Sequence, residues 1–462
     1  MQSATRPFRR AFMAVLALTI ALGTLPAMAA EKQRIRVDDY LINAELQPKT
    51  HKLMARAKLT FTALEDISVA SFELNNALRP TRIIDAEGHP LTAERVTQDS
   101  TIRVALPAGL AKGSSSTLTV DYEGVLLSGD DSPVQGLKLA YIGDETSYLL
   151  YASRWFPMVG YGTNRFTATM HITVPPGLTV VGSGMQALPA ARTSAGEDAP
   201  KLVYAQAKQR KSRPRTKAEP PAAGEGAFVT TPGWKTYTFS WTKPSFPGTI
   251  IASQFAQSVV NAGGLKLNVY FNPKHKDLVG AYAETAEKEF SYFTLIYGPA
   301  VSNTLNVVEI PDDTVPSAWA PEIAALATRS ISEKVNYRLL ANTIAHQWWG
   351  ALVSPATRDD WWLSDGFARY SEARYIESAA GQAGLEEAVK DMEVGALAYD
   401  SVPLSRVSTL DTFSPEFQSL TTDKGAVILH MLRWVVGDAA FDKTMRQFAT
   451  QYAWKSATVQ DF

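Results

Sequence analysis

Apolar and polar residues alternate along the first half of the chain. The segment 52–63 carries apolar residues at every second position, which places them all on one face of an extended chain. This two-residue period is typical of a half-buried strand. Similar strand-like segments follow, separated by turn signals such as Gly-His-Pro and Pro-Pro-Gly, at 116–127, 168–184 and 235–243. Together they predict an antiparallel β-sandwich or saddle.

The period changes at about residue 251, where apolar residues begin to recur at helical spacing. A short apolar run at 303–311 is expected to be a buried strand. Helices are expected at 278–298, 333–350, 364–381, 423–437 and 438–454. Ser364 is the expected N-cap of the third helix, and Gly350 and Gly381 end the second and third. The fold class is therefore α+β, with an N-terminal antiparallel β-saddle or sandwich domain followed by a mostly helical domain.

Residues 1–29 have the pattern of a secretory signal peptide. Three arginines precede an apolar run at 11–22, and the small-residue sequence Ala-Met-Ala closes the segment at 27–29. An uncleaved anchor helix is the alternative, but the run is shorter than the roughly 20 residues that span a bilayer. The chain also lacks cysteine. We expect a secreted protein of the bacterial periplasm, with no stable membrane span after cleavage.

Composition divides the rest into two domains. A β-domain at 30–250 contains a stretch rich in Ala, Pro and Gly at 187–233, and a helical domain follows at 251–462. The basic run 208–217 inside that stretch is interpreted as part of a flexible solvated loop, with contact to an anionic surface as the alternative. Without residues 1–29 the chain holds 42 basic and 46 acidic residues. This balance argues against binding to nucleic acid.

Four segments of the chain carry a resemblance to a known family. They read RWFP at 154–157, NTIAHQWWG at 342–350, WLSDGFARYSE at 362–372 and DKGAVILHMLR at 423–433. In this order they resemble the zinc aminopeptidases of the alanyl-aminopeptidase and leukotriene-A hydrolase type, which are gluzincins. The resemblance implies a thermolysin-like second domain, followed in the family by a helical lid. Because the sequence stops at Phe462, we expect that domain to be incomplete or to lack the C-terminal lid.

The resemblance implies zinc ligands and catalytic groups that this chain largely replaces. Asn342 stands at the first histidine ligand, and Thr343 stands at the glutamate base of the H-E-x-x-H motif. His346 is retained, and Asp365 replaces the third ligand, a glutamate. Thr422 replaces the tyrosine that stabilises the oxyanion. A neutral amide is a poor zinc ligand, and a hydroxyl cannot accept a proton near pH 7. Catalysis is therefore expected to be lost.

The retained residues allow more than one interpretation. His346 and Asp365 could form a residual metal site, but we favour a hydrogen bond between them that joins two helices. Glu322 lies near the family's substrate-amine anchor but out of register, and Glu372 matches a family acid that faces the site. Both are candidate substrate-binding residues. Tryptophans occur in pairs at 348–349 and 361–362, and packing is preferred over a substrate wall.

Three functions remain open at this point. The first is a non-catalytic member of the family that binds peptides or a protein partner and needs no cofactor. The second is an active zinc-dependent aminopeptidase with a rearranged site, in which Asp359, Asp360 or Glu372 supplies a missing ligand. The third uses the β-domain and the 187–233 stretch as a binding surface, with the helical domain as its scaffold.

Overall fold

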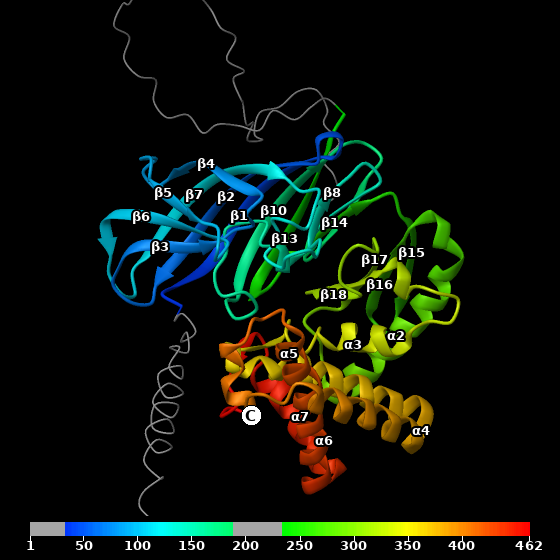
Figure 1. Ribbon diagram of the computed structural model, residues 1–462. Helices are drawn as coiled ribbons and strands as arrows, with labels where there is room; N and C mark the ends of the chain where they lie inside the picture. The colour runs from blue at the N-terminus through cyan, green and yellow to red at the C-terminus, as the bar shows by residue number, and fades with distance from the viewer. Residues whose placement is uncertain (1–32, 188–232) are drawn as a thin grey trace, which may run out of the picture.

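The computed structural model describes residues 33–187 and 233–462. Figure 1 shows a half rich in strands and, below it, a half built mainly of helices. The expected signal peptide at 1–29 lies outside the described residues, as does nearly all of the stretch at 187–233. The predicted fold class is confirmed, since strands dominate the N-terminal half and helices dominate the C-terminal half.

The described part of the first half forms three sheets. A seven-stranded sheet has the order β12-β13-β10-β1-β2-β7-β4, beside a four-stranded sheet β11-β14-β9-β8 and a three-stranded sheet β3-β6-β5. Neighbouring strands are antiparallel, except that β1 pairs with β10 in parallel. The strands are β1 Ile35–Gln47, β2 Lys52–Ala63, β3 Ile67–Glu73, β4 Leu78–Ile84, β5 Ala93–Val96, β6 Thr101–Leu110, β7 Ser115–Val125, β8 Ala140–Ile142, β9 Thr146–Leu149, β10 Phe166–Val174, β11 Thr179–Gly182, β12 Met185–Ala187, β13 Lys235–Ser245 and β14 Ile250–Ser253.

The second half has its own five-stranded sheet, with the order β15-β16-β17-β19-β18. Its strands are β15 Ala256–Ala262, β16 Leu265–Phe271, β17 Thr304–Ile310, β18 Ser317–Ala320 and β19 Ile323–Ala327, and a separate pair joins β20 Val353–Pro355 to β21 Lys455–Ala457. The helices are α2 Val279–Tyr297, α3 Tyr337–Ala345, α4 Asp365–Ala398, α5 Pro415–Gln418, α6 Gly425–Val436 and α7 Asp438–Gln451. The change from one half to the other falls between β14 and β15.

The expected and observed helix ends differ most for α3 and α4. Helix α3 was expected to cover 333–350, but it begins only after Asn336, whose side chain accepts a hydrogen bond from the backbone of Leu339. It ends before His346, because the chain then turns sharply to Gly350, which has φ +113°. Helix α4 runs past its expected end but contains a non-helical break at Gly381.

The helical half packs around a large apolar core. Helices α2, α3 and α4 share this core with the inner face of the five-stranded sheet, and Trp348 and Trp349 are completely buried in it. The preference for packing is therefore confirmed for this tryptophan pair. In the described part of the chain, no helix combines the length and apolar character needed to cross a membrane.

Arg165, just before β10, joins the two halves. Its guanidinium donates to the Pro244 carbonyl within the first half and to the Ala351 carbonyl, at 3.0 Å, in the second. It also donates to the Ser354 hydroxyl. The Ser245 hydroxyl donates to the same Ala351 carbonyl at 2.8 Å. These bonds fix the β-rich half against the segment that follows α3.

Candidate functional site

A cavity of about 300 Å³ lies where the two halves meet. The helical half contributes polar groups from α3, from the start of α4 and from the π-helical turn Ser419–Lys424. The β-rich half contributes mainly aliphatic and aromatic side chains. The polar lining includes Asn342, Thr343, His346, Asp365 and Thr422. The structure thus brings together all five residues that the resemblance placed at the zinc site, although they come from three separate segments.

His346 is buried at the C-terminal end of α3. Its Nδ1 lies 2.8 Å from the Trp349 carbonyl oxygen, and because a carbonyl only accepts, this nitrogen carries the proton. The Trp319 ring stacks on the imidazole at 4.7 Å between centroids. Burial lowers the pKa of His346 to about 4, so the ring is neutral at pH 7 and Nε2 keeps its lone pair.

The structure does not show the hydrogen bond that we expected between His346 and Asp365. Asp365 begins α4, and its Oδ2 accepts a hydrogen bond from the Trp361 indole at 2.9 Å. Loss of hydration raises the pKa of Asp365 to about 6, while hydrogen bonds from Trp361, Ser364 and Thr421 oppose that rise. Asp365 is therefore mostly ionised at pH 7. The short turn after α3 directs His346 toward Trp349 instead.

The three replaced positions offer little acid–base chemistry. The Thr343 hydroxyl donates to the Leu339 carbonyl at 2.7 Å, one helical turn back, and the residue is 1% exposed. Asn342 lines the cavity, and its amide makes no hydrogen bond to any described residue. Thr422 lines the same cavity from the π-helical turn. None of these groups can take a proton from water near pH 7.

The two candidate substrate-binding glutamates lie elsewhere. Glu322 occupies the turn between β18 and β19 with φ +65°, and its carboxylate accepts from the Gly184 backbone at 3.0 Å. It lines a different cavity, of about 670 Å³. Glu372 forms ion pairs with Arg338 and Arg369. Neither glutamate lines the cavity that contains His346.

The acids proposed as substitute ligands are also engaged elsewhere. Asp359 accepts a hydrogen bond from the Ser408 backbone at 2.8 Å. Asp360 accepts from the backbones of Thr357 at 3.0 Å and Val459 at 2.9 Å. Neither lines the cavity. The structure therefore does not place either carboxylate beside His346.

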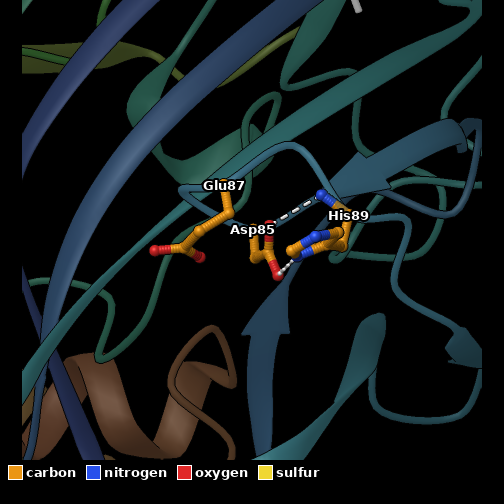
Figure 2. Close-up of side chains that lie close together, drawn as sticks. All are labelled: Asp85, Glu87 and His89. Carbon is orange, nitrogen blue, oxygen red and sulfur yellow. Dashed lines mark hydrogen bonds and ion pairs between the residues drawn. The ribbon is translucent and has the colours of Figure 1, made fainter.

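A group of acidic and histidine side chains lies far along the chain from this cavity. Within residues 33–187 and 233–462, one cluster of three possible metal ligands stands out, formed by Asp85, Glu87 and His89 (Figure 2). Both carboxylate oxygens of Asp85 are used, one by the His89 backbone at 2.7 Å and the other by the His89 ring at 3.1 Å. These contacts close a surface turn between β4 and β5.

Sequence reasoning missed the aromatic part of the cavity. Tyr161, Trp319 and Phe413 all line it, and Tyr161 packs against both Trp361 and Phe413. Trp361 also lines it, although packing alone had been preferred for the 361–362 pair. The available signal was the Gly-Tyr-Gly sequence at 160–162, soon after RWFP.

Comparison with known proteins finds a similarity to one family. Residues 323–462 match the peptidase family M1 domain. Human endoplasmic reticulum aminopeptidase 2 is 26% identical over 51% of this chain, and mouse aminopeptidase N is 27% identical over 53%. The matches cover 26% and 27% of those two proteins, so the chain spans about a quarter of the length of these curated relatives.

Solved structures share the fold over nearly the whole chain. The M1 zinc metallopeptidase from Deinococcus radiodurans aligns over 93% of this chain and 89% of its own, with a TM-score of 0.67 and 19% identity. A mutant of that protein bound to the substrate Tyr-Ser-Ala aligns with a TM-score of 0.68. At this identity the likeness is one of fold.

The expectation that no cofactor is needed is contradicted by these neighbours. They are M1 zinc metallopeptidases, so zinc is the cofactor of this family. The residues present nevertheless match the usual three-ligand set incompletely. His346 offers a free Nε2 and Asp365 a carboxylate, while the third position holds the neutral amide of Asn342. The ordinary hydrolytic zinc site therefore does not fit these side chains.

Proposed function

We propose that this chain, which belongs to the M1 family of zinc aminopeptidases of the alanyl-aminopeptidase and leukotriene-A hydrolase type, binds peptides in its cleft without hydrolysing them. The cleft is the cavity between the two halves. Its volume of about 300 Å³ suits a ligand of small size. Its mixture of aromatic rings and a few polar groups suits a peptide with one side chain held among the rings.

The observation that carries the proposal is the state of Thr343. Peptide hydrolysis in this family needs a base beside the attacking water, and that base contributes about 10²–10⁴-fold to the rate. Here the position holds a hydroxyl that is buried and already donates to the Leu339 carbonyl. The missing tyrosine at Thr422 removes a further donor, at a cost of about 10²–10³-fold. Losses of this size leave binding as the activity that the cavity retains.

The test measures binding and hydrolysis on the same purified protein with zinc supplied. Titration calorimetry with Tyr-Ser-Ala should show saturable binding, while aminoacyl-coumarin substrates should release no coumarin above the rate without protein. Asp365→Ala is the control, because it should weaken binding within an intact fold. Turnover that requires zinc would overturn the proposal.

A second candidate function is an active zinc-dependent aminopeptidase. Two observations favour it: the free Nε2 of neutral His346, and the ionised Asp365 in the same cavity. The named relatives are themselves aminopeptidases. This function requires turnover that chelators remove and that Asp365→Ala abolishes. If neither treatment changes the measured rate, this candidate fails.

We further propose export to the bacterial periplasm, on the signal-like pattern of residues 1–29. Expression of the full chain in a Gram-negative host, followed by fractionation, tests this. The shortened protein should appear in the periplasmic fraction with its N-terminus near residue 30. An uncleaved protein retained in the cytoplasm would contradict it.

A further inference from the structure

Two tyrosines of the β-rich half, Tyr151 and Tyr161, line the cavity, and Tyr161 is the one that packs against Trp361. Tyr161 belongs to the loop that precedes β10, and its side chain lines the cavity together with Asp365 and Thr422. The ring packs against Trp361, with centroids 5.7 Å apart, and against Phe413 at 5.5 Å. Its hydroxyl makes no hydrogen bond with any described residue. The group is therefore an unused donor beside the polar wall of the cavity.

The backbone around Tyr161 is held firmly. Gly160 and Gly162 have positive φ angles of +54° and +72°. The Gly160 carbonyl accepts from the backbones of Thr163 at 2.9 Å and Asn164 at 2.8 Å, which closes the turn. A Cβ on Gly162 would lie 2.2 Å from the Trp361 ring, so the loop rests directly on that ring. A donor positioned in this way loses little entropy when it binds a ligand.

The electrostatic surroundings keep the phenol protonated. Burial, and then the negative charge of Asp365, raise the pKa of Tyr161 above its ordinary value. The Trp361 indole that packs on Tyr161 also donates a hydrogen bond to Asp365 at 2.9 Å. Trp361 therefore contacts both Tyr161 of the β-rich half and Asp365 of the helical half. A hydroxyl donor and a carboxyl acceptor thus lie at one cavity. This pair is complementary to a peptide, whose backbone carbonyl accepts and whose amino groups donate.

We propose that Tyr161 is a peptide-binding residue, whose hydroxyl donates a hydrogen bond to a backbone carbonyl oxygen of the peptide in the cleft. Thr422 faces the same cavity, but its short side chain lacks the reach of a phenol. The donor that the helical half lacks is supplied by the β-rich half. This inference rests on the proposed peptide binding and assigns one of its contacts.

The test compares Tyr161→Phe with the wild-type protein. The substitution removes one oxygen atom and keeps the ring that packs on Trp361. Its dissociation constant for Tyr-Ser-Ala, measured by calorimetry, should rise roughly threefold to tenfold, which is the usual worth of one neutral hydrogen bond. Tyr399→Phe is the matched control, because Tyr399 is exposed beyond the end of α4, and its affinity should not change.

A second arm identifies the acceptor. Each peptide bond of Tyr-Ser-Ala is replaced in turn by a trans-alkene, which removes that carbonyl. For one of the two analogues, the wild-type protein should lose affinity and Tyr161→Phe should show no further loss. Equal affinity of Tyr161→Phe and wild type for Tyr-Ser-Ala overturns the inference and leaves the proposed function standing. If the wild-type protein binds no Tyr-Ser-Ala, the proposed function fails and the inference fails with it.

Discussion

At the scale of single residues, the cavity brings together the positions that the family resemblance assigns to a zinc site, and four of those positions hold other side chains. Asn342 and Thr343 lie in the last turns of α3, beside His346 and across from Asp365. Their side chains line the cavity, so larger groups at these positions would extend into it. Under the proposed function, these two side chains account for most of the lost chemistry.

Restoring those two side chains should restore hydrolysis. The double variant Asn342→His, Thr343→Glu regains a third strong ligand and a base, and we expect zinc-dependent release of coumarin at least about 10²-fold above wild type. The measurement is initial rate against zinc concentration. The single variant Thr343→Gln is the control, since it adds bulk without a base. A double variant as inactive as this control would show that the backbone no longer holds these side chains in a catalytic arrangement.

Glu289 on α2 predicts a dependence of stability on pH. Its side chain is fully buried, and neither carboxylate oxygen has a hydrogen-bond partner among the described residues. Burial, and then the charge of Glu372, raise the pKa of Glu289 well above its ordinary value. The folded state therefore keeps a proton that the unfolded state releases above about pH 4.5. Wild-type stability should fall as pH rises through this window, by up to about 1.4 kcal/mol per pH unit.

Glu289→Gln should remove that dependence. The difference in melting temperature between the variant and wild type, measured by scanning calorimetry, should grow from pH 5 to pH 8 in favour of the variant. Glu284→Gln is the control on the same helix. Glu284 is exposed, and its hydrogen bond with Lys288 lowers its pKa, so both states are ionised in this range. Parallel pH curves for Glu289→Gln and wild type would contradict a buried neutral carboxyl group.

Site residues were predictable to the extent that they lie in contiguous motifs. Asn342, Thr343, His346 and Asp365 could be assigned from the family resemblance, and they do share one cavity. Glu322 could not be placed, because the left-handed turn between β18 and β19 sends its carboxylate toward Gly184. Tyr161 was missed because it reaches the cavity from the other half of the molecule. A local sequence pattern does not predict contacts between segments that are distant in the chain.

At the scale of elements, two glycines set how closely α4 and α6 cross. A Cβ on Gly366 would lie 2.9 Å from the Cα of Gly425, and 2.9 Å from the Thr421 carbonyl. Both neighbours are backbone atoms, which cannot move without displacing α6 or the π-helical turn that precedes it. Since Gly366 directly follows Asp365, this crossing also positions the carboxylate in the cavity.

Gly366→Ala should therefore destabilise the protein by about 1–3 kcal/mol through overpacking. It should also weaken binding of Tyr-Ser-Ala, because the start of α4 must shift. Gly280→Ala on α2 is the matched control, since a Cβ there meets open space. It should stabilise the protein by about 0.4–1 kcal/mol. Urea unfolding measures both, and a Gly366→Ala variant as stable as Gly280→Ala would show that the crossing can relax.

Periodicity predicted the type of most elements but not all of their ends. The alternation in 52–63 corresponds to β2, and the helical spacing in 278–298 corresponds to α2, within one residue at each end. The end of α3 was wrong by several residues, because the turn from His346 to Gly350 is stabilised by contacts from other segments. One such contact is the bond from the Trp348 indole to the Gly298 carbonyl at 2.8 Å. The parallel pairing of β1 with β10 likewise depends on segments distant in sequence.

At the scale of the whole molecule, the cavity depends on the position of the two halves relative to each other. Arg165 fixes that position through its hydrogen bonds to the Pro244 and Ala351 carbonyls and to the Ser354 hydroxyl. Arg165→Leu leaves these acceptors without their donor, and each unsatisfied group costs about 1–3 kcal/mol. Because the lost bonds lie between the halves, we expect the wild-type protein to unfold in one calorimetric transition and this variant to unfold in two. Affinity for Tyr-Ser-Ala should fall, since Tyr161 and Asp365 come from different halves.

Arg36→Leu supplies the comparison for this variant. Arg36 is an exposed arginine within β1, and its ion pair with Asp38 stays inside the β-rich half. Exposed pairs of this kind contribute about 0–1 kcal/mol, so its melting profile and peptide affinity should match wild type. If Arg165→Leu also melts in one unchanged transition, other contacts hold the halves together. If it melts in two transitions and still binds Tyr-Ser-Ala as wild type does, the peptide is held by one half alone, and the cleft between the halves is not its site.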